Sequence, residues 1–208
     1  MNLTLEQMDA LSEIANIGAS KAAKQLSLLL HDIVEMSVPR LTIGSRREAL
    51  DLIAVAPQDD TAAVFQKASG LLNAEVALLF HSQESRELVQ ALVGADLPLD
   101  DVDMSAFEHE AMTEIGNIIV SACISTIADL LGGRVSLTIP VYVEGSFSDI
   151  WHQLEGGDMP QARYMLVMGT KLSAVQRNVN GSLVITFSLD DLNSLLRQID
   201  EWLAKMSS

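Results

Sequence analysis

The stretch Asp9-Ala-Leu-Ser-Glu-Ile-Ala-Asn16 decides the fold because it occurs twice. The second copy, Glu110-Ala-Met-Thr-Glu-Ile-Gly-Asn117, begins 101 positions later. In each copy a proline follows the Asn after twenty-two intervening residues, at Pro39 and Pro140. Ten of the thirty-one positions from Asp9 to Pro39 are identical to their counterparts, where chance gives roughly two. The chain is therefore predicted to be an internal duplication.

The duplication sets the expected domain organisation. A chain of 208 residues with a repeat of this size is predicted to form one domain, residues 1–208, with two similar halves. The first half is placed at residues 1–94 and the second at 105–208. The acidic stretch 95–104, which contains Pro98 and four aspartates, is predicted to be the linker between them.

Charge and composition exclude several classes of partner. The net charge is −15, and such a surface repels nucleic-acid backbones and anionic membranes. The one cysteine, Cys123, excludes an internal disulfide, fits a reducing compartment and is interpreted as a small buried hydrophobe. The chain opens without a signal-peptide pattern and has no run of eighteen apolar residues. We therefore expect a soluble, cytoplasmic protein.

Each half shows the same order of predicted elements: a long helix, three or four strands and a short helix. The long helices are predicted from Thr4, an N-cap with Gln7 three residues on, to Leu30, and from Ser105 to Leu131. Short helices are predicted at 83–93 and 189–205, and Gly145 to Gly157 is predicted to be a loop, or a loop with a short strand. Strands are predicted at 33–42, 52–56, 62–67, 75–80, 135–144, 163–172 and 182–188.

These elements define the expected fold class. It is α+β, with an antiparallel sheet, two long helices that bear the repeated motifs, helices on one side of the sheet and pseudo-twofold symmetry.

Each long helix has a polar stripe whose residues are spaced four, three and four apart, so that they share one face. The stripes are Asp9, Glu13, Asn16 and Ser20, and Glu110, Glu114, Asn117 and Ser121. A polar face opposite an apolar stripe is ordinarily just the solvated side of an amphipathic helix. Here the central Glu and Asn recur at the same spacing. Small neighbours, Ala15 and Gly116, are expected to leave their tips accessible to a docking surface.

The Glu and Asn pair points to a shared active site. The chain has no Ser-His or Cys-His arrangement for a nucleophile, and its four histidines show no metal-ligand spacing. An Asn amide both donates and accepts, which suits it to hold a water for in-line attack on a phosphoryl group. A Glu one turn away can make a charge-assisted bond to a lysine. The pair therefore makes chemical sense as half of a site that a phosphoprotein completes with its own metal and lysine.

The doubled Glu-x-x-Asn with Pro twenty-three residues after each Asn resembles the CheC/CheX/FliY family of chemotaxis phosphatases, across essentially the whole chain. The double copy is most similar to the CheC branch. The resemblance implies hydrolysis of the aspartyl-phosphate on a CheY-type receiver. It implies that Glu13 and Glu114 bind the receiver's lysine and that Asn16 and Asn117 orient the attacking water. Mg²⁺ would belong to the receiver, so no cofactor of the chain's own is expected. The family also makes the deamidase CheD a candidate second partner.

Two residues depart from the family pattern, and two other readings stay open. Glu110 stands where the family has Asp or Ser, and Lys21 follows Ser20 where CheC-like chains often have Gly-Asn. Lys21 either alters receiver choice or lies on the solvated side. In a different class of function, the helices dock a phospho-receiver, CheD or a flagellar switch partner without hydrolysis. A purely structural α+β domain would make the repeated motif a coincidence.

Overall fold

The computed structural model describes residues 3–44, 46–50, 53, 59–93, 101–154, 163–174 and 177–206. The two long helices are α1, Leu5–Leu30, and α4, Asp101–Leu130. The predicted cap of α1 is confirmed: Thr4 Oγ1 accepts from Gln7 N at 3.1 Å, and Gln7 Oε1 accepts from Thr4 N at 3.0 Å. α4 begins before the predicted Ser105, so Asp101–Met104 belongs to the helix rather than to the linker. Residues 95–100 of that linker lie outside the described residues.

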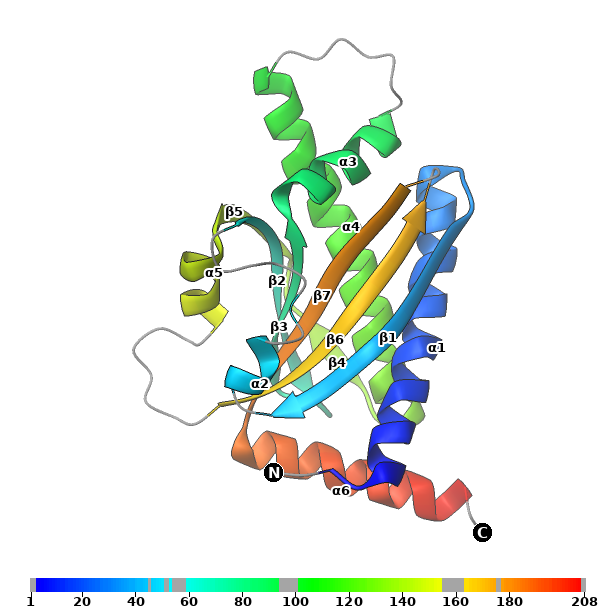
Figure 1. Cartoon of the computed structure of the whole chain (residues 1–208). Helices are drawn as coiled ribbons and strands as arrows, with labels where there is room; N and C mark the ends of the chain where they lie inside the picture. The colour runs from blue at the N-terminus through cyan, green and yellow to red at the C-terminus, as the bar shows by residue number, and fades with distance from the viewer. Residues whose placement is uncertain are drawn as a thin grey trace.

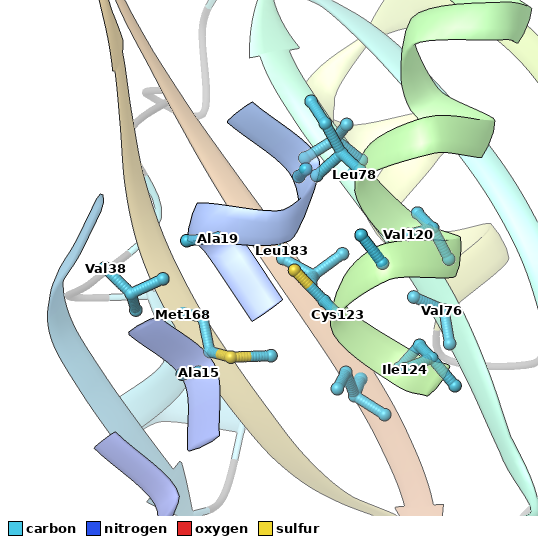
Figure 2. Packing of buried hydrophobic residues seen from close by; sticks show 14 of the residues in the cluster. Ala15, Ala19, Val38, Val76, Leu78, Val120, Cys123, Ile124, Met168 and Leu183 are labelled. Carbon is cyan, nitrogen blue, oxygen red and sulfur yellow. The ribbon is translucent and has the colours of Figure 1, made fainter. Parts of the chain in front are cut away.

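The two helices lie side by side on one face of the sheet, with α6, Leu189–Met206, across one end (Figure 1). Their contact is close at Gly18, where an added Cβ would stand 2.9 Å from the Cα of Cys123. The apolar stripe opposite the polar one is predicted from spacings of three and four. It is confirmed, since Leu29 is partly buried and its other six members are buried, namely Leu11, Ile14, Ala15, Gly18, Ala22 and Leu26. Figure 2 shows Cys123 of α4 beside α1, whereas Ala15 and Ala19 of α1 lie toward Val38 and Met168 of the sheet.

One helix segment among the described residues, Ala106–Leu130, is long and apolar enough to cross a membrane by length and composition alone. Its most apolar window is 61% buried inside the structure, against α1 and the sheet. Burial of this extent is what a core helix shows. The structure is thus consistent with the soluble protein that the sequence predicts.

The sheet is antiparallel throughout its described pairings, as predicted. Its order is β1-β6-β7-β3-β2-β4, and β5 also pairs with β2. The strands are β1 Val34–Gly44, β2 Asp60–Gly70, β3 Ala74–His81, β4 Val135–Leu137, β5 Val141–Ser146, β6 Arg163–Ala174 and β7 Arg177–Ser188. The single strand predicted at 135–144 is therefore two strands, and the strand predicted at 52–56 falls almost wholly outside the described residues.

The topology supports the duplication. Both halves run through long helix, first strand, short helix, two strands and helix, with the first strand of the second half divided into β4 and β5. When each strand is replaced by its counterpart in the other half, the sheet order reads the same from the opposite edge. The first strand of each half pairs with the other half, because β1 lies against β6 and β5 lies against β2. The two halves therefore complete one another's sheet, related by a pseudo-twofold axis between β3 and β7.

Helices cover both faces of the sheet, so the expectation of helices on one side was wrong. The larger apolar core lies between the sheet and α1, α4 and α6. A smaller core lies on the opposite face under α2, Arg46–Leu50, and α5, Phe147–Leu154. The predicted loop at 145–157 is thus in part the helix α5. Its Trp151 is 3% exposed and stacks on Phe147, so it packs in the smaller core.

The remaining helices match their predictions. α3 spans Ser82–Val93 and follows β3 directly, as α6 follows β7. α6 begins behind Ser188, whose Oγ accepts from Asp191 N at 3.2 Å, a side-chain cap of the kind that starts helices.

Candidate functional site

The first polar stripe lies on the exposed side of α1. Asp9, Glu13, Asn16 and Ser20 are all exposed there. Asn16 is held in place at both ends of its amide: Nδ2 donates to Ser12 O at 2.9 Å, and Oδ1 accepts from Val38 N at 3.1 Å. Ser20 Oγ donates to the backbone oxygen of Asn16 at 2.9 Å. The amide is therefore fixed between its own helix and β1, with Glu13 one turn before it.

The second stripe, on α4, is more enclosed. Glu110 and Glu114 are exposed, whereas Asn117 and Ser121 are half-buried. Asn117 Oδ1 accepts two hydrogen bonds, from Gln66 Nε2 and from Ser121 Oγ, each at 3.3 Å. Both bonds are longer than usual, since N–H···O bonds are ordinarily about 2.7–3.2 Å and O–H···O bonds about 2.5–3.0 Å. The structure thus brings Glu and Asn together on both helices, and it places all eight predicted residues along the two stripes.

The proline spacing has a physical reason in the structure. Val38, whose N–H binds Asn16, directly precedes Pro39, and the pairing of β1 with β6 shifts register between Ser37 and Arg40. In the second half the strand is interrupted at the same place, between β4 and β5, just before Pro140. A proline has no N–H for a sheet ladder. Each proline therefore marks the point where a strand leaves its ladder beside an Asn.

The two stripes face opposite edges of the sheet. Asn16 contacts β1, which is the first strand in the sheet order. Asn117 contacts β2, which together with β4 and β5 forms the other edge. Two partners could therefore approach the two stripes from different sides.

The small neighbours of the motif have a different role from the one expected. Ala15 is 3% exposed and Gly116 is also buried, so both face the sheet rather than a partner. A Cβ on Gly116 would stand 2.6 Å from the Cγ1 of Val64 on β2. These positions are small because the helices lie close to the strands.

Lys21 is exposed and forms an ion pair with Asp129 of α4 at 3.8 Å. An exposed pair of this kind contributes little to stability. The pair joins α1 to α4 one residue after Ser20. Its exposure agrees with the prediction that Lys21, which departs from the family pattern, lies on the solvated side of the helix.

A polar cluster around the buried Glu108 connects the first turns of α4 to α3 and β5. Glu108, 7% exposed, accepts from Ser85 Oγ at 2.9 Å and from Tyr142 Oη at 3.2 Å. Arg86 lies 3.7 Å from Glu108 and 2.9 Å from Glu144. Burial raises the pKa of Tyr142, and the two carboxylates raise it further. The cluster ties α3, α4 and β5 together next to Glu110 and Glu114.

Sequence reasoning missed the strand residues that hold the Asn side chains. Val38 acts through its backbone, for which the side chains give no signal. Gln66 had a signal, because it is the polar member of an inward-facing alternation that otherwise reads Ala62, Val64 and Ala68. A groove of about 770 Å³ adjoins it, lined by Phe65, Gln66, Lys67, Glu75, Leu137, Thr138, Ile139 and Val141.

Metal chemistry has no evident ligand set within the described part of the chain. No group of three or more His, Cys, Asp or Glu side chains is arranged to hold an ion there. The expectation that Mg²⁺ belongs to a receiver remains a prediction.

Comparison with known proteins gives three informative matches. The CheC-like family model matches residues 6–43, which include the first motif and its proline. The CheY-P phosphatase CheC of Bacillus subtilis is 27% identical over 136 residues, 65% of this chain and 65% of that protein, just under two thirds of each. A putative CheY-P phosphatase CheC1 of Halobacterium salinarum is 22% identical over 199 residues, 95% of this chain and 97% of that protein.

In three dimensions, the crystal structure of Thermotoga maritima FliY has a TM-score of 0.72 at 18% identity, and the match covers 99% of both chains. The fold is therefore that of the CheC-like α+β proteins, with two motif-bearing helices on an antiparallel sheet. The resemblance to the CheC/CheX/FliY family that the repeated motif indicated is thus confirmed.

Proposed function

We propose that this protein hydrolyses the aspartyl-phosphate of a CheY-type receiver, in line with the names CheY-P phosphatase CheC and putative CheY-P phosphatase CheC1 of two of its relatives. The observation that best supports the proposal is the paired Asn side chain. On each motif helix it is held against a strand by its Oδ1 and has an exposed Glu one turn before it. The Asn is thus positioned before any partner arrives, which is what water positioning requires.

The roles of the two residues follow from their chemistry. Glu13 and Glu114 are exposed carboxylates that can bind the receiver's active-site lysine through a charge-assisted bond. Asn16 and Asn117 reach the acyl phosphate beside it and orient the attacking water. A carbonyl oxygen has two lone pairs. Asn16 Oδ1 uses one of them on Val38 N and keeps the other for a water proton.

Asn117 would work with longer bonds. Its Oδ1 accepts from both Gln66 and Ser121, each at 3.3 Å, and a docked water can replace the contact with the Ser121 hydroxyl. Positioning of a water without covalent catalysis gives an acceleration on the order of 10² over spontaneous hydrolysis. Mg²⁺ would be supplied by the receiver, where it neutralises the phosphoryl oxygens.

The decisive experiment follows the decay of a phosphorylated CheY-type receiver with substoichiometric amounts of this protein. Asn16→Ala and Asn117→Ala should each remove part of the acceleration, and the double variant should remove all of it. Asn193→Ala, on α6 away from both stripes, is the matched control and should keep full activity. Acceleration that survives the double change would exclude the mechanism.

Stability must be checked in the same series, because Asn16→Ala leaves the Val38 N–H without its acceptor. The expected cost is about 1 kcal/mol, which leaves the protein folded. Asn16→Asp retains an acceptor for Val38 but has no N–H, so it separates the two effects. A folded double variant without activity supports the proposal.

The alternative reading, a binding module, has its own outcome in this assay. Binding of the phospho-receiver without turnover, unchanged by Asn117→Ala, would mean that the protein sequesters its partner. CheD as a second partner and the cytoplasm as the location stay predictions from the family resemblance and from composition. A binding measurement with purified CheD tests the first of them.

A further inference from the structure

Gln66 lies under the second stripe, where β2 passes α4. Its side chain is 3% exposed, and its Nε2 is shared between two acceptors. One is the backbone oxygen of Thr138 at 2.8 Å, and the other is Asn117 Oδ1 at 3.3 Å. The side chain therefore connects the interrupted strand between β4 and β5 to the Asn of the second motif.

The Thr138 carbonyl determines how both amides are oriented. A backbone carbonyl only accepts hydrogen bonds, so the Gln66 atom next to it must be the NH₂ group. The NH₂ group in turn requires an acceptor on Asn117, which turns Asn117 Oδ1 toward the strand. The Nδ2 of Asn117 then points away from Gln66. One fixed backbone group thus sets the orientation of the Asn amide through a single side chain.

The first half reaches the same result without such a residue. There the backbone N–H of Val38 binds Asn16 Oδ1 directly, and Val38 is 5% exposed. The counterpart of Val38, 101 positions on, is Ile139, which is 85% exposed because the strand is broken at this point. In the second half Gln66 supplies the donor that the displaced strand does not.

Packing alone does not explain a glutamine at this position. Its inward-facing neighbours Val64 and Ala68 are apolar. Within the described part of the chain, Gln66 Oε1 is buried without a hydrogen-bond partner, which ordinarily costs stability. An unbranched apolar side chain such as Met would fill the same space without that cost.

We propose that Gln66 is a positioning residue for the second site, which fixes the orientation of the Asn117 amide relative to the docked phosphoryl group and the attacking water. The inference rests on the proposed phosphatase function and adds a residue outside the motif to it. It also makes the two sites different in construction, since the first depends on a backbone donor and the second on a replaceable side chain.

The test uses Gln66→Met, which removes the donor and keeps the length, and Gln66→Glu, which keeps the length but has only acceptors when ionised. Each is placed in the Asn16→Ala protein, where only the second site works. Both should lower kcat for receiver dephosphorylation about five- to tenfold, which is the value of one orienting hydrogen bond. KM should stay the same, because Glu114 still binds the receiver.

The matched background is the Asn117→Ala protein, in which the residue that Gln66 positions is already gone. Gln66→Met should have no further effect there. A purely structural role predicts the opposite pattern: a lower Tm for Gln66→Met and equal losses in both backgrounds. That pattern, or an unchanged kcat in the Asn16→Ala background, would overturn the proposal.

A second readout needs no activity. In ¹⁵N-labelled protein, Gln66→Met should shift the side-chain NH₂ signals of Asn117 and leave those of Asn16 unchanged. If neither the wild-type protein nor any variant accelerates dephosphorylation, the proposed function has failed. The NMR result still tests whether Gln66 positions Asn117. Asn117 signals that do not move in Gln66→Met would rule it out.

Discussion

Cys123 shows how burial determines the chemistry of a single residue. It lies on α4 opposite Gly18 of α1 and is 2% exposed (Figure 2). Burial raises the pKa of its thiol from 9.0 to about 12. A thiol that stays protonated is a poor nucleophile, which agrees with the interpretation of this cysteine as a small hydrophobe.

The raised pKa predicts a loss of stability in alkali. Between pH 9 and 12 the folded protein keeps the Cys123 proton, whereas the unfolded chain releases it. The stabilisation contributed by the protonated Cys123 thiol is therefore fully present below pH 9. Well above pH 9, the free energy of unfolding falls by about 1.4 kcal/mol per pH unit. Urea unfolding from pH 8 to 10 measures this fall in the free energy of unfolding. Most of this range lies below 10.0, the ordinary pKa of Tyr, so the titration of Tyr142 adds little to it. Cys123→Ala should flatten the slope, and equal slopes would contradict the prediction.

Gly116 is required by a close approach rather than by backbone conformation. Gly116→Ala would ordinarily stabilise a helix by about 1 kcal/mol. Here its Cβ would lie 2.6 Å from Val64, so we expect a net loss of about 1–3 kcal/mol. Thermal unfolding measures the change. In a Val64→Ala background the same substitution should cost less, and an equal cost in both backgrounds would show that the clash is relieved elsewhere.

Single residues also show what the sequence could predict about the site. Glu13, Asn16, Glu114 and Asn117 could be found because their spacing repeats. Gln66 could not be found in this way, because it acts in one half only and its partner Asn117 is 51 positions away. Val38 acts through its backbone N–H, a group that every residue except proline has. The sequence therefore does not distinguish Val38 from its neighbours.

At the scale of elements, α5 was missed although its signals are present. Ser146 Oγ accepts from Asp149 N at 3.2 Å, which is the Ser-x-x-Asp start of a helix. Phe147, Ile150 and Trp151 follow at helical spacing and are all buried. The nearby glycines favoured a loop, and the stretch has only 8 helical residues. The long helices and most strands, in contrast, have enough periods of their pattern to be assigned from sequence.

The interrupted strand between β4 and β5 gives a prediction about docking. Ile139, 85% exposed, lies between Thr138 and Pro140 beside the second site and lines the groove next to Gln66. If the receiver covers this segment, Ile139→Ser should raise KM roughly fivefold in the Asn16→Ala background, by loss of apolar contact. We expect kcat and Tm to stay the same. Ile33→Ser, at a residue 79% exposed outside both stripes, is the control. An unchanged KM would place the receiver away from this segment.

For the whole molecule, the placement of the stripes at opposite sheet edges predicts two independent docking events. We expect one chain to bind two receivers that carry an acyl-phosphate mimic such as beryllofluoride with Mg²⁺. Light scattering after size exclusion should show the 2:1 complex. Glu13→Lys places a cation opposite the receiver's lysine and should reduce the complex to 1:1. Glu114→Lys should do the same, and a 1:1 complex of the wild-type protein would show that only one stripe docks a receiver.

The exchange of first strands between the halves has a consequence for synthesis on the ribosome. Among the described strands β1 pairs with β6 alone, and the paired residues Val34 and Ala174 are 140 positions apart. Contacts so distant in sequence close slowly, because the intervening chain must first be ordered. A nascent chain that has completed its first half therefore presents β1 with an unpaired edge and β2 without β5. The protein should consequently acquire protease resistance in one late step, after residue 174 has emerged, rather than half by half.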